Sequence, residues 1–135
     1  MNKEIVFVIL LGAFVLLTYF YQKRVQESLL KKLYQYKREH KEKDFMNMLD
    51  SIFIKIVFSK FTLEFMKLNY YLDHHAYNKA KEQFKNFQQM KLKNRDFLAL
   101  NLRMFNSALE AKDYYLASTL KEMILPVLKK QTDEN

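Results

Sequence analysis

The chain has 135 residues, a formal net charge of +8 and a composition that is 50% hydrophobic. It contains one glycine, one proline and no cysteine. The lack of cysteine excludes disulfide bonds and thiolate chemistry, and the single glycine excludes the glycine-rich loops that cradle phosphates. Sheet proteins of this size need glycine or proline at their turns, so we expect an all-α protein.

The first predicted element is an uncharged apolar stretch, residues 5–21. As a helix that rises about 1.5 Å per residue, it would extend roughly 25 Å, near the lower limit for crossing the hydrocarbon core of a bilayer. It ends in three aromatic residues, which are typical of a membrane–water interface. We interpret residues 1–24 as a transmembrane anchor. A cleaved signal peptide and a buried helix of a soluble protein are the alternatives, but the end of the stretch lacks the small residues of a cleavage site.

Residues 25–43 are predicted to be a basic juxtamembrane helix, continuing the anchor to about Lys37, followed by a linker. Residues 22–43 carry eight basic and three acidic side chains, an excess of +5. The positive-inside rule then predicts a single-pass protein with its C-terminal part in the cytoplasm, and the reverse topology is the alternative. Basic side chains here would be attracted to anionic lipid. Those expected at the membrane surface are Lys23, Arg24, Lys31 and Lys32.

Residues 44–130 are predicted to form one small helical domain, followed by a frayed tail at 131–135. Apolar residues recur every three or four positions in segments 44–57, 63–72, 76–90, 97–111 and 114–125. A turn or kink is expected near Ser59, and further breaks at 73–75 and 91–94. Pro126 is expected to end or bend the last helix. The predicted N-caps are Asp44, Asn94 and Asp113, and the inward face of the first helix is predicted to hold Phe45, Met48, Leu49, Ile52, Phe53, Ile56 and Val57.

Three predicted helix starts are alike: Lys43 to Leu49, His75 to Lys81 and Lys112 to Ser118. Each places an aromatic residue three positions before a methionine or alanine, and the aromatic residues are 32 and then 37 residues apart. The pattern resembles the second helix of the tetratricopeptide repeat, which has a period of about 34 residues and a small residue that lets paired helices approach closely. The resemblance is best over residues 63–125, whereas 29–58 match faintly. It implies a stack of antiparallel helical hairpins, and a generic small helical bundle is the alternative.

The resemblance also implies an interaction module, because the family uses the inner face of each first helix as a groove for a peptide or partner helix. The groove positions that correspond are Phe65, Asn69, Leu72, Leu102, Asn106 and Leu109. An amide at two of them could donate to and accept from an extended backbone. Members of the family that bind a terminal carboxylate have basic residues where this chain has Phe65 and Leu102. This difference argues against a carboxylate clamp in this chain. The alternative is that the asparagines are solvated helix positions and the apolar residues are core.

Enzymatic activity finds little support in the sequence. Histidine occurs only at positions 40, 74 and 75. On a helix the side chains of adjacent residues such as His74 and His75 point about 100 degrees apart, and no second histidine or glutamate stands at the three- or four-residue spacing of a metal site. We therefore predict no enzyme activity, no metal site, no cofactor and no small-molecule substrate. Residues 44–135 carry only three more basic than acidic side chains, so we also predict no nucleic-acid partner.

The function predicted from these features is a membrane-anchored scaffold or adaptor that presents a protein- or peptide-binding surface at the cytoplasmic face of the membrane. The alternative is a structural subunit that packs into a larger membrane complex and has no free groove. Its partners would be the lipid bilayer and another protein or peptide.

Overall fold

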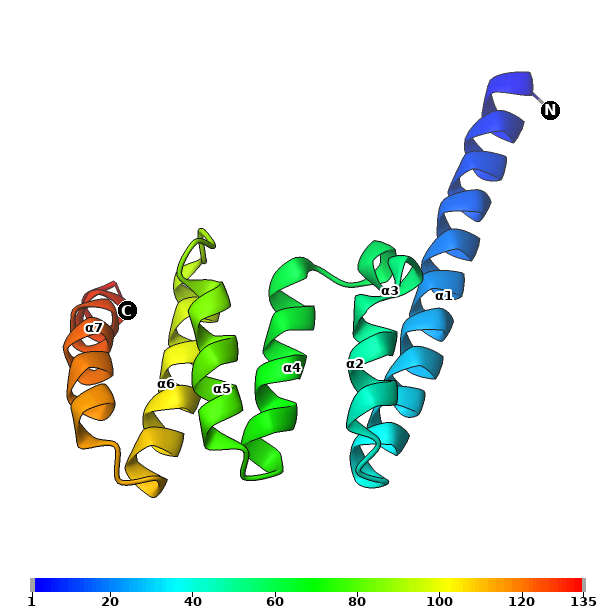
Figure 1. Ribbon diagram of the computed structural model, residues 1–135. Coiled ribbons are helices and arrows are strands. Elements are labelled where there is room, and N and C mark those ends of the chain that lie inside the picture. Colours follow the sequence, from blue (N-terminus) through cyan, green and yellow to red (C-terminus); the bar gives the residue numbers. More distant parts are fainter. Residues whose placement is uncertain (1, 135) are drawn as a thin grey trace. The chain divides into compact units, whose positions relative to one another are not determined.

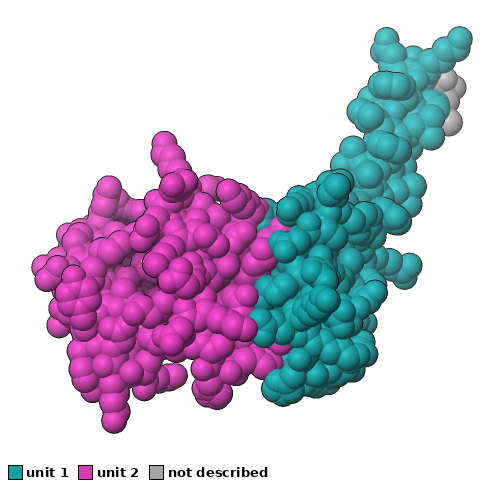
Figure 2. All heavy atoms as spheres, in the orientation of Figure 1, with its two compact units in different colours: residues 1–59 teal, residues 60–135 magenta. Residues whose placement is uncertain are grey.

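The computed structural model describes residues 2–134, and in this part of the chain every regular element is a helix. The chain divides into two compact units, Met1–Ser59 and Lys60–Asn135 (Figure 2). This division differs from the predicted single domain of residues 44–130, because the two helices that precede Ser59 group with the N-terminal helix. The all-α prediction is confirmed.

Helix α1, Lys3–Arg38, runs without interruption through the apolar stretch and the basic segment after it. Its 36 residues correspond to about 54 Å of helix. The apolar side chains of residues 5–21 are exposed. Among the described residues, α1 is the one helix long and apolar enough to cross a membrane. The predicted helical continuation beyond the apolar stretch to about Lys37 is confirmed, since α1 ends at Arg38.

The C-terminal half of α1 pairs with two short helices, α2 (Glu42–Asp50) and α3 (Ile52–Val57). Leu33 of α1 is buried, as are Phe45 and Leu49 of α2 and Ile54 of α3. The single helix predicted over 44–57 is wrong, because Ser51 adopts an extended conformation (φ −67°, ψ 143°). The Ser51 hydroxyl donates to the Met48 carbonyl oxygen at 2.8 Å, a local bond that competes with helix continuation.

That break also changes which apolar residues point inward. The predicted inward positions Ile52, Phe53 and Ile56 are exposed. Asp44, the predicted N-cap, lies inside α2, and Lys41 takes the N-cap position. The turn predicted near Ser59 is confirmed, since α3 ends at Val57 and the next helix begins at Lys60.

The second unit contains two helical hairpins (Figure 1). The first pairs α4 (Lys60–Asp73) with α5 (Tyr77–Phe84), which continues into the short 3₁₀ helix η1 (Lys85–Phe87). The second pairs α6 (Asn94–Glu110) with α7 (Tyr114–Asp133). Both hairpins contribute to one hydrophobic core, whose buried members are Leu68, Ala80, Phe87, Leu98, Leu100, Met104, Leu120 and Ile124.

Several predicted boundaries in this unit shift. The helix predicted over 76–90 ends as α5 and η1, and Asn94 is the first residue of α6 after Lys93 in the N-cap position. Asp113 does cap α7, accepting from the Leu116 amide at 3.2 Å. Pro126 does not end α7, which continues to Asp133 and so enters the predicted frayed tail. Residue 135 lies outside the described part.

The same turn joins the two helices of three hairpins, α1–α2, α4–α5 and α6–α7. One residue in each turn is left-handed: His40 (φ 57°), His75 (φ 58°) and Lys112 (φ 57°), 35 and then 37 residues apart. The amide of the following residue donates to a carbonyl oxygen five positions earlier, as in a Schellman-type helix end. These bonds are Lys41 to Tyr36 at 2.9 Å, Ala76 to Tyr71 at 2.8 Å and Asp113 to Ala108 at 2.8 Å.

These turns correct the alignment of the first helix start. When the left-handed residues are superposed in sequence, Phe45 corresponds to Ala80 and Ala117, all three of which are buried. Met48, which was matched to those alanines, lies three residues too far along. The repeated feature is the turn geometry, and the α1–α2 hairpin carries the large residue Phe45 where the other two hairpins carry an alanine.

The left-handed turn residues provide a test of this fold. A residue with a Cβ is strained by about 1 kcal/mol or more in this region, whereas glycine is not. Lys112→Gly is therefore expected to raise the free energy of unfolding by about 0.5–1 kcal/mol, measured by denaturant unfolding of the protein in detergent.

The matched control is Lys121→Gly, which lies inside α7 and is exposed. Glycine there should lower the free energy of unfolding by about 1 kcal/mol. Destabilisation of similar size by both substitutions would contradict the left-handed turn at Lys112.

Candidate protein-binding surface

Helix α6 presents two different faces. One face is buried in the core through Leu100, Met104 and Ala108. Another face exposes the three groove positions predicted on this helix. Leu102 is 38% exposed and Leu109 is 43% exposed, and Asn106 between them is also exposed. Their spacing of four and three residues places them in one row along the helix.

The predicted groove positions on α4 lie deeper than those on α6. Phe65 and Leu72 are half-buried and pack against the core of the second unit. Phe65 also stacks on Phe61, with 5.4 Å between the ring centroids. Phe65 and Leu72 therefore contribute to the core of the second unit, and only part of each side chain is accessible to a binding partner.

Asn69, the third predicted position on α4, is bound by a residue that the sequence did not single out. Arg103 of α6 donates from Nε to the Asn69 side-chain oxygen at 3.1 Å. Its Nη2 forms an ion pair with Asp73 at 2.8 Å. The two amides predicted to be equivalent thus differ, since Asn69 joins α4 to α6 while Asn106 is exposed.

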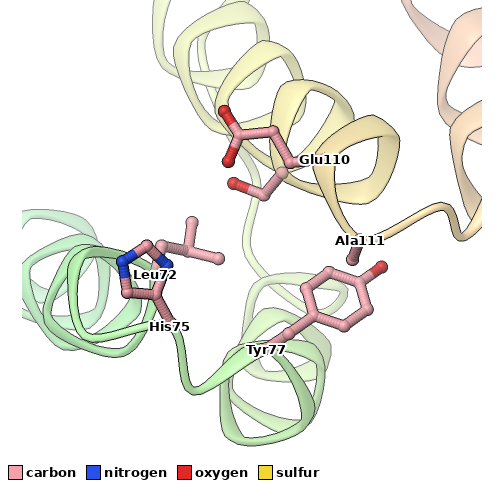
Figure 3. A pocket seen from close by; sticks show the side chains of 6 residues that line it. Leu72, His75, Tyr77, Glu110 and Ala111 are labelled. Carbon is pink, nitrogen blue, oxygen red and sulfur yellow. The ribbon is translucent and has the colours of Figure 1, made fainter.

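A cavity of about 210 Å³ lies where the α4–α5 turn meets the end of α6 (Figure 3). His75 and Tyr77 line it from the turn and the start of α5, and Glu110 and Ala111 line it from α6 and its C-terminal cap. Leu72 and Ser107 complete the lining. Cofactor and drug-sized ligand sites occupy about 300–1,000 Å³, so this cavity fits a single side chain of a partner better than a cofactor.

A second, more open hollow of about 480 Å³ lies over α5. Polar residues line it, among them Asn78, Gln83 and Asn86, but more of the surface they present there is apolar than polar. Lys79 lies 5.8 Å from the centroid of the Tyr71 ring at this hollow. Because it is more open than the first cavity, it would enclose a partner's side chain less completely.

Asp113 joins the two hairpins at the start of α7. Besides capping that helix, its carboxylate accepts from the Tyr77 hydroxyl and from Lys81 Nζ, each at 2.9 Å. Lys81 chiefly, then Tyr77 and the Leu116 amide, lower the pKa of Asp113. Burial, reinforced by the bond to Asp113, raises the pKa of Tyr77. Tyr77 is therefore fixed as a neutral donor beside the cavity.

The two adjacent histidines have different surroundings. The His74 ring stacks on Tyr70 with 4.1 Å between centroids, and its Nδ1 lies 2.8 Å from the Tyr70 carbonyl oxygen. Nδ1 must carry the proton to donate to that oxygen. His75 instead occupies the left-handed turn position. Within residues 2–134, no three His, Cys, Asp or Glu side chains gather in a way that could hold a metal ion.

The basic residues predicted for the membrane surface all lie on α1. Lys23, Arg24, Lys31 and Lys32 are exposed, whereas the neighbouring Leu29, Leu30 and Leu33 are half-buried or buried. Lys32 Nζ lies over the Tyr36 ring, 5.9 Å from its centroid. This part of α1 thus separates a basic exposed face from the face toward α2.

No protein-family model, no curated protein and no solved structure matches this chain at a significant level.

The Asp113 contacts predict a specific loss of stability in acid. Because its pKa is lowered on folding, the charged carboxylate stabilises the folded state above the ordinary aspartate pKa, near 3.8, and this stabilisation is lost as pH falls through the lowered value. Asp113→Asn keeps an N-cap side chain but removes the charge. The variant should be less stable than the parent protein at pH 7, and its stability should fall less steeply between pH 5 and about pH 2.

The matched variant Lys81→Met removes the cation that pairs with Asp113. The stability of each variant is measured by thermal unfolding between pH 7 and about pH 2. If the Asp113–Lys81 pair carries the effect, the double variant should lose less stability than the sum of the two single losses. Simple additivity, or an unchanged acid slope in Asp113→Asn, would contradict it.

Proposed function

We propose that this protein is a single-pass membrane-anchored helical adaptor whose second unit binds a segment of another protein along α6. The observation that carries the proposal is the exposed row formed by Leu102, Asn106 and Leu109, on a helix whose other face is fully used by the core. Two exposed leucines on either side of an amide offer apolar area together with a group that can both donate and accept.

The cavity beside α6 supports a peptide-like partner. Ser107 and Glu110, which line it, lie one residue after Asn106 and Leu109, so the cavity opens about 100 degrees to one side of the row on the same helix. A partner could lay its backbone along the row and insert one side chain into the cavity. The Glu110 carboxylate favours a donor or cationic group on that side chain.

The repeated hairpin turns support the tetratricopeptide-like interpretation of the fold. All three hairpins share one turn with the same left-handed position and the same backbone bond. In repeat proteins of this kind the surface of successive helices forms an extended binding site. The resemblance itself stays a prediction, based on spacing and turn geometry.

The apolar part of α1 would serve as the anchor. Its length and hydropathy meet the requirements of a membrane span. The exposed Lys23, Arg24, Lys31 and Lys32 follow it directly, which by the positive-inside rule favours a cytoplasmic second unit. The adaptor would then collect its partner at the cytoplasmic membrane surface, with no chemical step of its own.

A structural subunit of a larger membrane complex is the second candidate, and helix α7 favours it. Tyr115 is 87% exposed, and Leu125 and Leu128 on the same helix are 43% and 37% exposed. Repeat stacks need a polar outer face where they meet water, so an apolar outer helix indicates that another chain covers it. The two functions therefore use different surfaces.

Site-specific photo-crosslinking in the full-length, membrane-bound protein distinguishes them. With a photoreactive amino acid at Asn106, the adaptor should form a discrete adduct, and Leu102→Ala with Leu109→Ala should lower the affinity roughly tenfold and the adduct yield with it. Both leucines are exposed, so the double variant should change the free energy of unfolding by no more than about 0.5 kcal/mol per site.

Gln89, exposed in the loop after η1, is the control position and should give no discrete adduct. A discrete adduct at Leu125, with none at Asn106, would overturn the adaptor in favour of the complex subunit. An Asn106 adduct that is unchanged by the leucine substitutions would refute the proposed role of the row.

A further inference from the structure

Helix α3 exposes an apolar face that the fold of the first unit does not use. Ile52 is 79% exposed, Phe53 59% and Ile56 78%. The spacing of these residues places them on one side of the helix. Ile54, on the other side, is only 1% exposed and anchors α3 in the protein. Such a cluster of large apolar side chains needs a covering partner.

The position of α3 along α1 indicates what that partner is. Gln26 of α1 donates from its side-chain nitrogen to the Val57 carbonyl oxygen at the end of α3, at 3.4 Å. Gln26 follows the last aromatic residue of the apolar stretch, Tyr21, by five positions, or about 7.5 Å of helix. The polar headgroup layer on each side of a bilayer is of similar thickness, about 5–7 Å. Figure 1 shows α3 beside α1, at the end of α2 that lies toward the apolar half.

Charged side chains around this level suit a lipid surface better than a protein core. Lys23 and Arg24 on α1 are exposed, and so is Lys55 on α3 itself. Lysine and arginine can place their alkyl chains along the apolar layer while the charged ends reach the headgroups. Anionic lipid attracts basic side chains at this depth.

We propose that α3 is a second membrane contact, which inserts Ile52, Phe53 and Ile56 into the interfacial layer of the bilayer beside the span of α1. This proposal rests on the membrane span in the proposed function. It assigns to the break at Ser51 a role in turning the chain so that α3 lies across the membrane surface instead of continuing α2. The first unit would then be held at the bilayer by two contacts.

Tryptophan fluorescence tests this proposal in the full-length protein, because the chain has no tryptophan. Phe53→Trp is conservative and introduces a single tryptophan on the exposed face of α3. The protein is reconstituted into phosphatidylcholine–phosphatidylglycerol vesicles that contain lipid brominated either near the headgroup or near the end of the acyl chain. The headgroup-proximal bromines should quench the Phe53→Trp variant several-fold more strongly than the deep bromines do.

Two control variants separate failure of this proposal from failure of the anchor. Phe14→Trp lies in the apolar half of α1 and should be quenched most by the deep bromines. Tyr34→Trp, at an exposed position of α1 about 20 Å of helix beyond Tyr21, should not be quenched by either lipid. Quenching of Phe14→Trp without quenching of Phe53→Trp would overturn the α3 proposal and leave the anchor in place. No quenching of Phe14→Trp would refute the anchor itself, and the α3 proposal with it.

A soluble quencher identifies the other possible occupants of the α3 face. If iodide quenches Phe53→Trp freely, the face is in water, and if neither iodide nor bromolipid quenches it, another protein covers it. Either result would overturn the proposal. Adding Ile52→Asn and Ile56→Asn to Phe53→Trp should reduce bromolipid quenching by at least half and increase iodide quenching, while the Phe14→Trp signal in the same background stays unchanged.

Discussion

The continuity of helix α1 is the constraint on which the arrangement of the first unit depends. A single run of backbone hydrogen bonds joins the apolar stretch to the segment that packs on α2. Because a helix transmits both position and rotation along its length, every residue of the α1–α2 hairpin has a fixed height and direction relative to the apolar half. The short helix α3 therefore lies at a fixed distance along α1 from the apolar stretch. A flexible linker directly after the apolar stretch could not impose this relation, because it would let the hairpin move relative to the apolar half.

The hairpins depend on a second constraint, the reversal of the chain in very few residues. Each turn uses one left-handed residue and one bond back to a carbonyl oxygen. Glycine is the residue that tolerates this conformation best, yet His40, His75 and Lys112 occupy it here. The packing of the paired helices must therefore outweigh the local strain. Ala80 and Ala117, each five residues after a left-handed turn residue, are buried in that packing.

The sequence predicted the helical class, the extent of α1 and the Asp113 cap because each depends on local information: composition, apolar periodicity and a capping side chain. It failed at Ser51 because an unbroken apolar period continues through that residue, and only the local hydroxyl bond and tertiary packing stop the helix. The same failure reversed the directions of Ile52, Phe53 and Ile56. It also placed the N-cap of α6 at Asn94, one residue later than Lys93, which takes that position in the structure.

The candidate surface could be predicted only in part. The exposed row on α6 follows from helix periodicity once the core face is recognised. The role of Asn69 could not be foreseen, because its partner Arg103 is 34 residues away and an isolated arginine in a helix carries no signal of what it will contact. The cavity likewise combines residues from a turn, a helix start and a helix end, whose meeting depends on how two hairpins pack.

Asp113 gives the second unit a property that a chain of independent repeats would lack. The same carboxylate completes the first turn of α7 and holds Tyr77 and Lys81 of the preceding hairpin. If the α6–α7 hairpin detached while staying folded, Tyr77 and Lys81 would lose this acceptor. Asp113, the N-cap of α7, would in turn lose the hydrogen bonds that Tyr77 and Lys81 donate to it. Partly unzipped states, which are common in linear repeat arrays, would lose these contacts together with the core that both hairpins share, so the carboxylate adds to the coupling between the hairpins.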